Sequence, residues 1–131
     1  MTELRRVGEV MTPNPVSISE AASLAEATGL LDSRQISGLP VIDKNGLLVG
    51  VLSQTDLIRA QANPQLQANW RGLAVREIMT KPALTIPATA GLDEAARLMG
   101  EHRVHRLVVT DDAATPIGII SASDLVRSWL G

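Results

Sequence analysis

The sequence is organised around a ten-residue stretch that occurs twice, as GVLSQTDLIR at 50–59 and as GIISASDLVR at 118–127. In each copy a glycine and two apolar residues precede a serine, and an aspartate follows the serine three positions later. The apolar residues before the serine are typical of a buried strand, and the pattern after it is typical of a helix. Each copy therefore predicts a strand that runs directly into a helix, with the serine and the aspartate at the junction.

The duplication extends well beyond these ten residues. An offset of 68 residues aligns Val7 with Val75 and continues without a gap to the end of both junction stretches. Self-similarity at a fixed spacing indicates a repeated structural unit. We therefore predict two repeats, at 7–60 and 75–129, joined by a connector at 61–74 that has room for one helical turn. The prolines in 11–15 and 79–83 predict irregular segments there, since proline ends a helix.

The residue pattern within each repeat predicts the element order β-α-β-β-α. Alternating or continuous short apolar runs are typical of strands, and apolar residues at helical spacing indicate an amphipathic helix. In the first repeat these segments are 16–18, 24–31, 39–43, 47–52 and the helix after Ser53. A unit of about sixty residues is marginal alone, because it buries too little surface. We predict a mixed α/β fold, α+β-like in arrangement, in which two pseudo-symmetric repeats pack into one module.

Composition narrows the classes of partner and location. The chain has 131 residues, of which 45% are hydrophobic and 20% charged, and this composition is typical of a globular protein. Its net charge of −2 provides no general attraction to nucleic acid or to anionic lipid, so we expect neither nucleic acid nor membrane as a partner. The chain has no cysteine, no apolar run of about eighteen residues and no signal-peptide core at its start, so the expected location is cytoplasmic.

The junction residues have two interpretations that use the same geometry. Ser53 with Asp56, and Ser121 with Asp124, match a capping box, in which serine and carboxylate satisfy backbone N–H groups at the helix start. The same fixed carboxylate can accept two hydrogen bonds from a vicinal diol such as a ribose. The residues alone favour capping and leave ligand binding open.

A second candidate stretch is HRLVV at 105–109, where His105 and Arg106 lead into a strand. Arg106 could hold a phosphate through two hydrogen bonds, whereas the alternative is a pair of surface residues on a strand edge. The first repeat has Ser37 and Gly38 at these positions, so any grip on a phosphate is unequal between the repeats.

The remaining chemistry argues against catalysis and metal binding. His102 and His105 are the two histidines, and without cysteine they cannot complete a typical zinc site. The chain has neither a G-x-S-x-G nucleophile motif nor a glycine-rich phosphate loop, so we predict no enzyme activity and no catalytic cofactor. Trp70 and Trp129 are expected to form a hydrophobic lid or a dimer contact rather than a ligand platform.

Three motifs recur in the same order in both halves: EVMT and EIMT, then SGLPVID and HRLVVTD, then GVLSQTDL and GIISASDL. Together they resemble the CBS domain family, named after cystathionine β-synthase, in its tandem paired form. The second repeat is also similar to the γ subunit of AMP-activated protein kinase. The resemblance implies a paired module that binds adenosine nucleotides or related adenosyl ligands in a cleft between the repeats.

The resemblance also assigns residues to two sites. It gives Asp56 and Asp124 the ribose hydroxyls, and it places further residues in the same pockets: Ser53, Thr55, Ser121 and Ser123. In the γ subunit that the second repeat resembles, the His-Arg pair faces the nucleotide phosphates, from the repeat opposite to the one that supplies the aspartate. One site would therefore combine Asp56 and Ser53 with His105 and Arg106, and the other would combine Asp124 and Ser121 with Ser37 and Gly38. The second site lacks the His-Arg pair. It is therefore expected to stay empty, to take adenosine without phosphate contacts, or to serve the fold only.

The expected function is a non-enzymatic, adenine-nucleotide-binding regulatory module that senses energy or metabolite levels. AMP, ADP or ATP is the first choice of ligand because Arg106 favours an anion. We expect a homodimer that passes its signal to a protein partner, which the sequence does not identify, or to its other protomer. Two alternatives remain: a ligand-free structural dimerisation module, and a regulator that binds S-adenosylmethionine.

Overall fold

The computed structural model describes residues 5–130 and divides the chain into two compact units. One unit is continuous and spans Val16–Ala83. The other is split, because it joins the residues up to Pro15 with those from Leu84 onward. We call them the continuous unit and the split unit.

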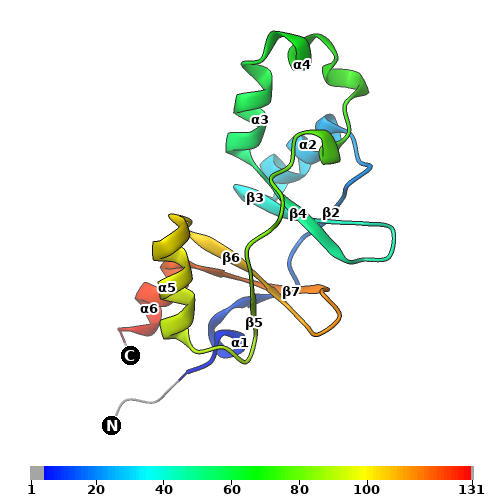
Figure 1. Ribbon diagram of the computed structural model, residues 1–131. Coiled ribbons are helices and arrows are strands. Elements are labelled where there is room, and N and C mark those ends of the chain that lie inside the picture. The colour runs from blue at the N-terminus through cyan, green and yellow to red at the C-terminus, as the bar shows by residue number, and fades with distance from the viewer. Residues whose placement is uncertain (1–4, 131) are drawn as a thin grey trace. The chain divides into compact units, whose positions relative to one another are not determined.

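The continuous unit carries the predicted order of the first repeat (Figure 1). Its elements are β2 (Ile18–Ser19), α2 (Leu24–Arg34), β3 (Gly38–Ile42), β4 (Leu48–Ser53) and α3 (Gln54–Gln61), followed by α4 (Pro64–Ala68) and the short 3-10 helices η1 (Trp70–Gly72) and η2 (Val75–Glu77). The sheet order is β2-β3-β4, with β2 parallel and β4 antiparallel to β3. The β-α-β-β-α prediction is therefore confirmed for this repeat.

Local signals explain where helix α2 begins and ends. The Ser23 hydroxyl accepts a hydrogen bond from the Glu26 N–H at 3.1 Å, which caps the helix start. The helix ends at Arg34, and the φ of 52° at Gln35 places this next residue in the left-handed conformation common after a last helical turn. Its buried face forms a core with the strands, made of Leu24, Ala27, Leu31, Leu39, Val41 and Leu52.

The split unit repeats this order and adds two elements from the start of the chain (Figure 1). Its elements are α1 (Val7–Val10), β1 (Thr12–Pro13), β5 (Thr85–Pro87), α5 (Leu92–His102), β6 (Arg106–Thr110), β7 (Pro116–Ser121) and α6 (Ala122–Ser128). The sheet order is β1-β7-β6-β5. A second core forms around residues that include Ile86, Ala95, Leu107, Val109 and Ile120. The β-α-β-β-α order is thus confirmed for the second repeat as well.

The two repeats exchange their leading segments. In the continuous unit, the start of repeat 2 pairs with repeat 1, because Val51 and Thr80 exchange backbone hydrogen bonds of 3.0 and 2.9 Å. In the split unit, the start of repeat 1 pairs with repeat 2, because Thr12 lies opposite Ile119 in the β1–β7 pair. The predicted repeat boundaries describe the sequence duplication, whereas the compact units divide at 16 and 84.

The first leading segment contains more structure than its prolines suggested, whereas the connector has the short helix for which its sequence had room. The segment at 11–15 was expected to be irregular, yet Thr12 and Pro13 form strand β1. The connector contains the helix α4, with Pro64 at its first turn and the Asn63 side chain as its cap. Trp70 follows α4 and packs against the core of the continuous unit, as a lid would.

Over residues 5–130, no helix is both long and apolar enough to cross a membrane.

Candidate functional site

The first junction, between β4 and α3, fixes its aspartate through a capping box. The Asp56 N–H donates to the Ser53 hydroxyl at 3.2 Å, and the Ser53 N–H donates to Asp56 Oδ2 at 2.9 Å. Asp56 is only 5% exposed, so its carboxylate depends on these partners. A buried charge is costly unless it is hydrogen-bonded, and the capping interpretation supplies that compensation.

The other oxygen of Asp56 is held by a residue that sequence reasoning missed. The Thr80 hydroxyl donates to Asp56 Oδ1 at 2.9 Å. The Arg59 guanidinium approaches the same oxygen only to 3.9 Å. Thr80 lies 24 residues from Asp56 in a segment expected to be irregular, and the only sequence signal for it is the repeated Met-Thr pair at each repeat's start.

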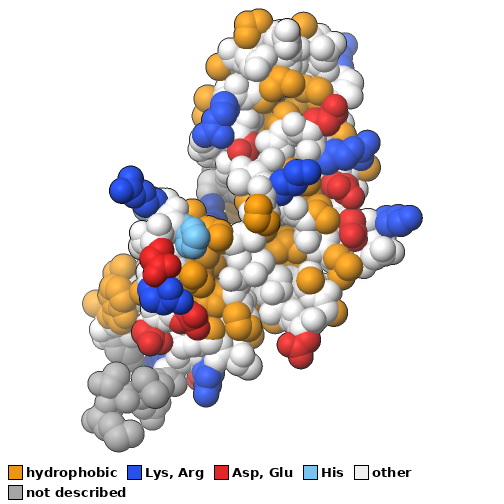
Figure 2. Space-filling model, viewed as in Figure 1, with side chains coloured by type: hydrophobic (Ala, Val, Ile, Leu, Met, Phe, Trp, Pro, Cys, Tyr) orange, Lys and Arg blue, Asp and Glu red, His pale blue; other side chains and the backbone are white. Residues whose placement is uncertain are grey.

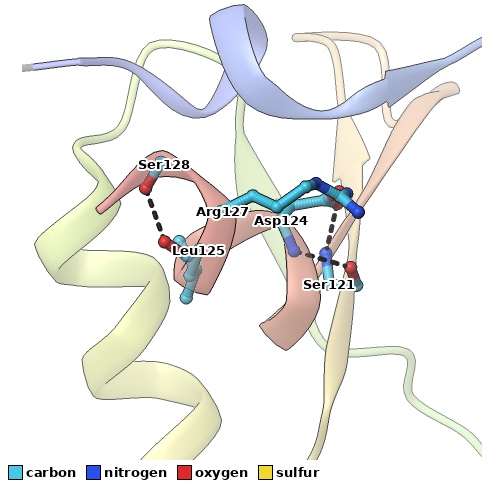
Figure 3. Close-up of polar contacts among 5 residues, drawn as sticks. All are labelled: Ser121, Asp124, Leu125, Arg127 and Ser128. Atoms are coloured by element: carbon cyan, nitrogen blue, oxygen red, sulfur yellow. Dashed lines mark hydrogen bonds and ion pairs between the residues drawn. The ribbon is translucent and has the colours of Figure 1, made fainter. Parts of the chain in front are cut away.

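The second junction, between β7 and α6, has the same capping box. The Asp124 N–H donates to the Ser121 hydroxyl at 3.1 Å, and the Ser121 N–H donates to Asp124 Oδ2 at 2.8 Å. Asp124 is 6% exposed. Its Oδ1 accepts from the Arg127 guanidinium at 2.5 Å, and Figure 3 shows the Arg127 side chain extending along the helix to this carboxylate.

Sheet register places the other predicted residues of each unit beside that unit's own junction. In the continuous unit, Gly38 lies opposite Ser53, and the Gln54 N–H donates to the Ser37 carbonyl at 2.9 Å. Thr55 lies in the first turn of α3 and is exposed.

The split unit has the equivalent arrangement. Arg106 lies opposite Ser121, and the Ala122 N–H donates to the His105 carbonyl at 2.7 Å. Ser123 is exposed in the first turn of α6. The two predicted combinations, Asp56 with His105 and Arg106, and Asp124 with Ser37 and Gly38, each draw on both units and stay predictions.

Capping does not use up the acceptor capacity of these carboxylates. An ionised carboxylate offers about four lone-pair positions on its two oxygens. At Asp56 one position of Oδ2 faces the Ser53 N–H and one of Oδ1 faces the Thr80 hydroxyl, so each oxygen keeps a further acceptor position. The junction can therefore cap its helix and accept hydrogen bonds from a diol at the same time.

Within the described part of the chain, no three His, Asp or Glu side chains come together in a group that could hold a metal ion.

The surface charge is mixed in sign. On the face seen in Figure 2, positive and negative side chains are interspersed rather than gathered into a region of one sign.

Comparisons with known proteins identify this architecture. A sequence model of the CBS domain matches residues 7–63 and again residues 75–131. The chain is 32% identical over 126 residues to inosine-5'-monophosphate dehydrogenase of Nitrosopumilus maritimus, covering 96% of the chain but only 25% of that enzyme. It is 33% identical to the CBS domain-containing protein CBSX2, chloroplastic, of Arabidopsis thaliana, covering 95% of the chain and 63% of that protein.

Solved structures give the same result. The crystal structure of CBSX2 in complex with AMP has a TM-score of 0.85 and 35% identity, with 96% of each chain covered. The CBS domain pair of protein MJ0100, in complex with 5-methylthioadenosine and S-adenosyl-L-methionine, has a TM-score of 0.86 and 26% identity, with 98% of each chain covered. With the family matched in both halves and its paired fold present over nearly the whole length, this chain belongs to the CBS domain family as a tandem pair.

Proposed function

We propose that the chain is a regulatory module that binds an adenine nucleotide and has no catalytic activity of its own. The observation that carries the proposal is the buried aspartate at each junction, held by backbone and side-chain donors yet with acceptor positions left over. A fixed carboxylate of this kind suits the two hydroxyls of a ribose. A ligand bound there regulates by favouring one of two conformations, so a partner protein is part of the proposal.

AMP, ADP or ATP is the ligand class we favour. CBSX2, crystallised with AMP, shares 35% of its sequence with this chain, whereas MJ0100, crystallised with 5-methylthioadenosine and S-adenosyl-L-methionine, shares 26%. The exposed Arg106 also suits a phosphate better than it suits a sulfonium ligand. S-Adenosylmethionine remains the second candidate, because the MJ0100 pair has the same fold and the aspartates do not depend on a phosphate.

The proposed binding residues keep the two predicted combinations. Asp56 and Ser53, with Thr55 nearby, would hold the ribose of the first site, and His105 and Arg106 its phosphates. For the second site, the same roles fall to Asp124 and Ser121 with Ser123 nearby, and Ser37 and Gly38 would line it without a cation.

A homodimer is part of the proposal because apolar side chains are exposed on the junction helices. Figure 2 shows hydrophobic side chains gathered over α6. The exposed large apolar residues of the described chain include Ile58 on α3, Val126 on α6, and Trp129 and Leu130 just after it. Exposed apolar residues that gather in one patch mark interaction surfaces, whereas single ones are normal, so the residues on and after α6 carry this part of the proposal. Sedimentation of the purified chain tests the dimer, and a monomer at all concentrations would remove it from the proposal.

The cysteine-free sequence supports a cytoplasmic location.

Calorimetric titration with AMP, ATP and S-adenosylmethionine tests the function. Asp56→Asn keeps the size of the side chain and removes its charge, so we expect AMP affinity to fall by about tenfold or more, as for loss of hydrogen bonds to a charged group. Arg106→Gln should weaken AMP and ATP more than S-adenosylmethionine.

Ser23→Ala is the matched control, because it removes an equivalent helix cap far along the chain from either junction. It should cost about 1 kcal/mol of stability and leave affinity unchanged. Unchanged AMP affinity in Asp56→Asn would refute the ribose assignment. Absence of binding by all three compounds would favour a ligand-free structural module.

A further inference from the structure

The two junction aspartates differ in the group that holds Oδ1. At Asp56 this group is the neutral Thr80 hydroxyl, at 2.9 Å. At Asp124 it is the cationic Arg127 guanidinium, at 2.5 Å. The carboxylates are almost equally buried, with 5% and 6% of each residue exposed, so burial does not explain the difference.

The backbone around the two aspartates does not explain it either. Thr12 is the repeat counterpart of Thr80, and it lies opposite Ile119 just as Thr80 lies opposite Val51. Both aspartates are followed three residues later by an arginine. Arg59 and Arg127 are similarly exposed, at 74% and 69% of their side chains, yet only Arg127 makes a hydrogen bond to its aspartate. The two junctions therefore share backbone pairing and the position of the arginine, and they differ in which side chain donates to Oδ1.

These contacts have different consequences for a ligand. A threonine hydroxyl contributes one donor and no net charge, and the Arg59 guanidinium lies 3.9 Å from Asp56 Oδ1 without a hydrogen bond, so more of the lone pairs of Asp56 stay available to the two hydroxyls of a ribose. A guanidinium contributes several donors and a full positive charge, and it competes for the lone pairs that a diol would use. A diol that binds Asp124 must displace Arg127 or share the carboxylate with it.

We propose that Arg127 is a specificity-determining residue that makes Asp124 the weaker diol acceptor, so that an adenosyl ligand occupies the Asp56 junction first. This inference rests on the proposed function, because it assumes that the aspartates hold a ribose. It adds a cause for unequal affinity of the two sites that does not involve His105 and Arg106.

The test uses adenosine, which is neutral, so that phosphate contacts and the charge of the ligand do not enter. Calorimetry is done in an Asp56→Asn background, where only the Asp124 junction keeps its carboxylate. Adding Arg127→Gln should strengthen adenosine binding by about two- to fivefold, the size expected for loss of a competing, largely exposed ion pair. Adding Arg127→Lys should give a smaller gain, because the positive charge remains.

Three further measurements define what the gain means. Adding Arg59→Gln instead should leave adenosine binding unchanged, because Arg59 lies three residues after the other aspartate. 2',3'-Dideoxyadenosine, which lacks the vicinal 2'- and 3'-hydroxyls, should show no gain with Arg127→Gln. In the protein with Arg127 intact, sodium chloride should strengthen adenosine binding at this junction, because salt screens an exposed ion pair, and Arg127→Gln should abolish this effect.

The outcomes separate the inference from the function on which it rests. If Asp56→Asn weakens AMP binding but Arg127→Gln does not strengthen adenosine binding, the function stands and the role of Arg127 is wrong. If Asp56→Asn leaves AMP binding unchanged while Arg127→Gln strengthens adenosine binding, Arg127 keeps its role and the assignment of Asp56 fails. If neither AMP nor adenosine binds any variant, both are refuted.

Discussion

The β4–α3 and β7–α6 junctions share a backbone design and differ in chemistry. Both strands end in a serine that caps the following helix, and both helices place an aspartate at the third position to complete the box. The partners at Oδ1 differ, because Thr80 reaches Asp56 whereas Arg127 reaches Asp124. The two repeats thus share the geometry that holds the carboxylate, and they differ in the side chain that donates to its second oxygen.

The largest expected effect tests whether the two cores are equivalent. Leu52 and Ile120 occupy matching positions in β4 and β7 and are both 0% exposed. Leu52→Ala and Ile120→Ala should each lower the free energy of unfolding by about 2–5 kcal/mol, because each leaves a cavity in a packed core. Chemical denaturation measures both. A loss confined to one variant would show that only one core limits the stability of the chain.

A smaller effect is expected at the two glycines that lie against the exchanged leading segments. A Cβ added at Gly50 would lie 2.8 Å from the Thr80 carbonyl oxygen, which is held in a backbone pair, and 2.9 Å from Met79 Sδ. A Cβ added at Gly118 would meet the flexible side chain of Met11.

Gly50→Ala should therefore cost about 1–3 kcal/mol, the range of overpacking, and Gly118→Ala should cost less, because a methionine adapts its shape. Thermal unfolding of both variants makes the comparison. Equal losses would contradict the view that backbone and side-chain obstacles differ here.

The smallest effect concerns the threonines of these segments. Thr80→Val removes the neutral hydroxyl that fixes the orientation of the Asp56 carboxylate, so it should cost about 1 kcal/mol of stability and weaken AMP binding, because the carboxylate is no longer held in place for the ribose. Thr12→Val is the matched control in the other segment, and it should change both quantities little, because Asp124 Oδ1 accepts from Arg127. Denaturation and calorimetry on the pair decide the matter. Equal behaviour of the two variants would remove Thr80 from the site.

Much of the fold was predictable because its signals are local. The spacing of Leu24, Ala27 and Leu31 indicates a helix, and the structure buries this face in the core. The serine and aspartate of each junction lie three residues apart, so one helical turn is enough to bring them together. In the connector, room for one helical turn could be predicted but not its bounds, because α4 begins from the Asn63 cap rather than from an apolar pattern.

The sequence by itself determined the duplication, the element order within each repeat and the capped aspartate at each junction, since these depend on residue type and short spacing. Only the tertiary structure decided that the leading segments are exchanged and that Thr80 holds Asp56. The physical reason is distance along the chain. A contact between residues 24 positions apart depends on how strands pair, and strand pairing is set by the burial of whole faces rather than by any local pattern.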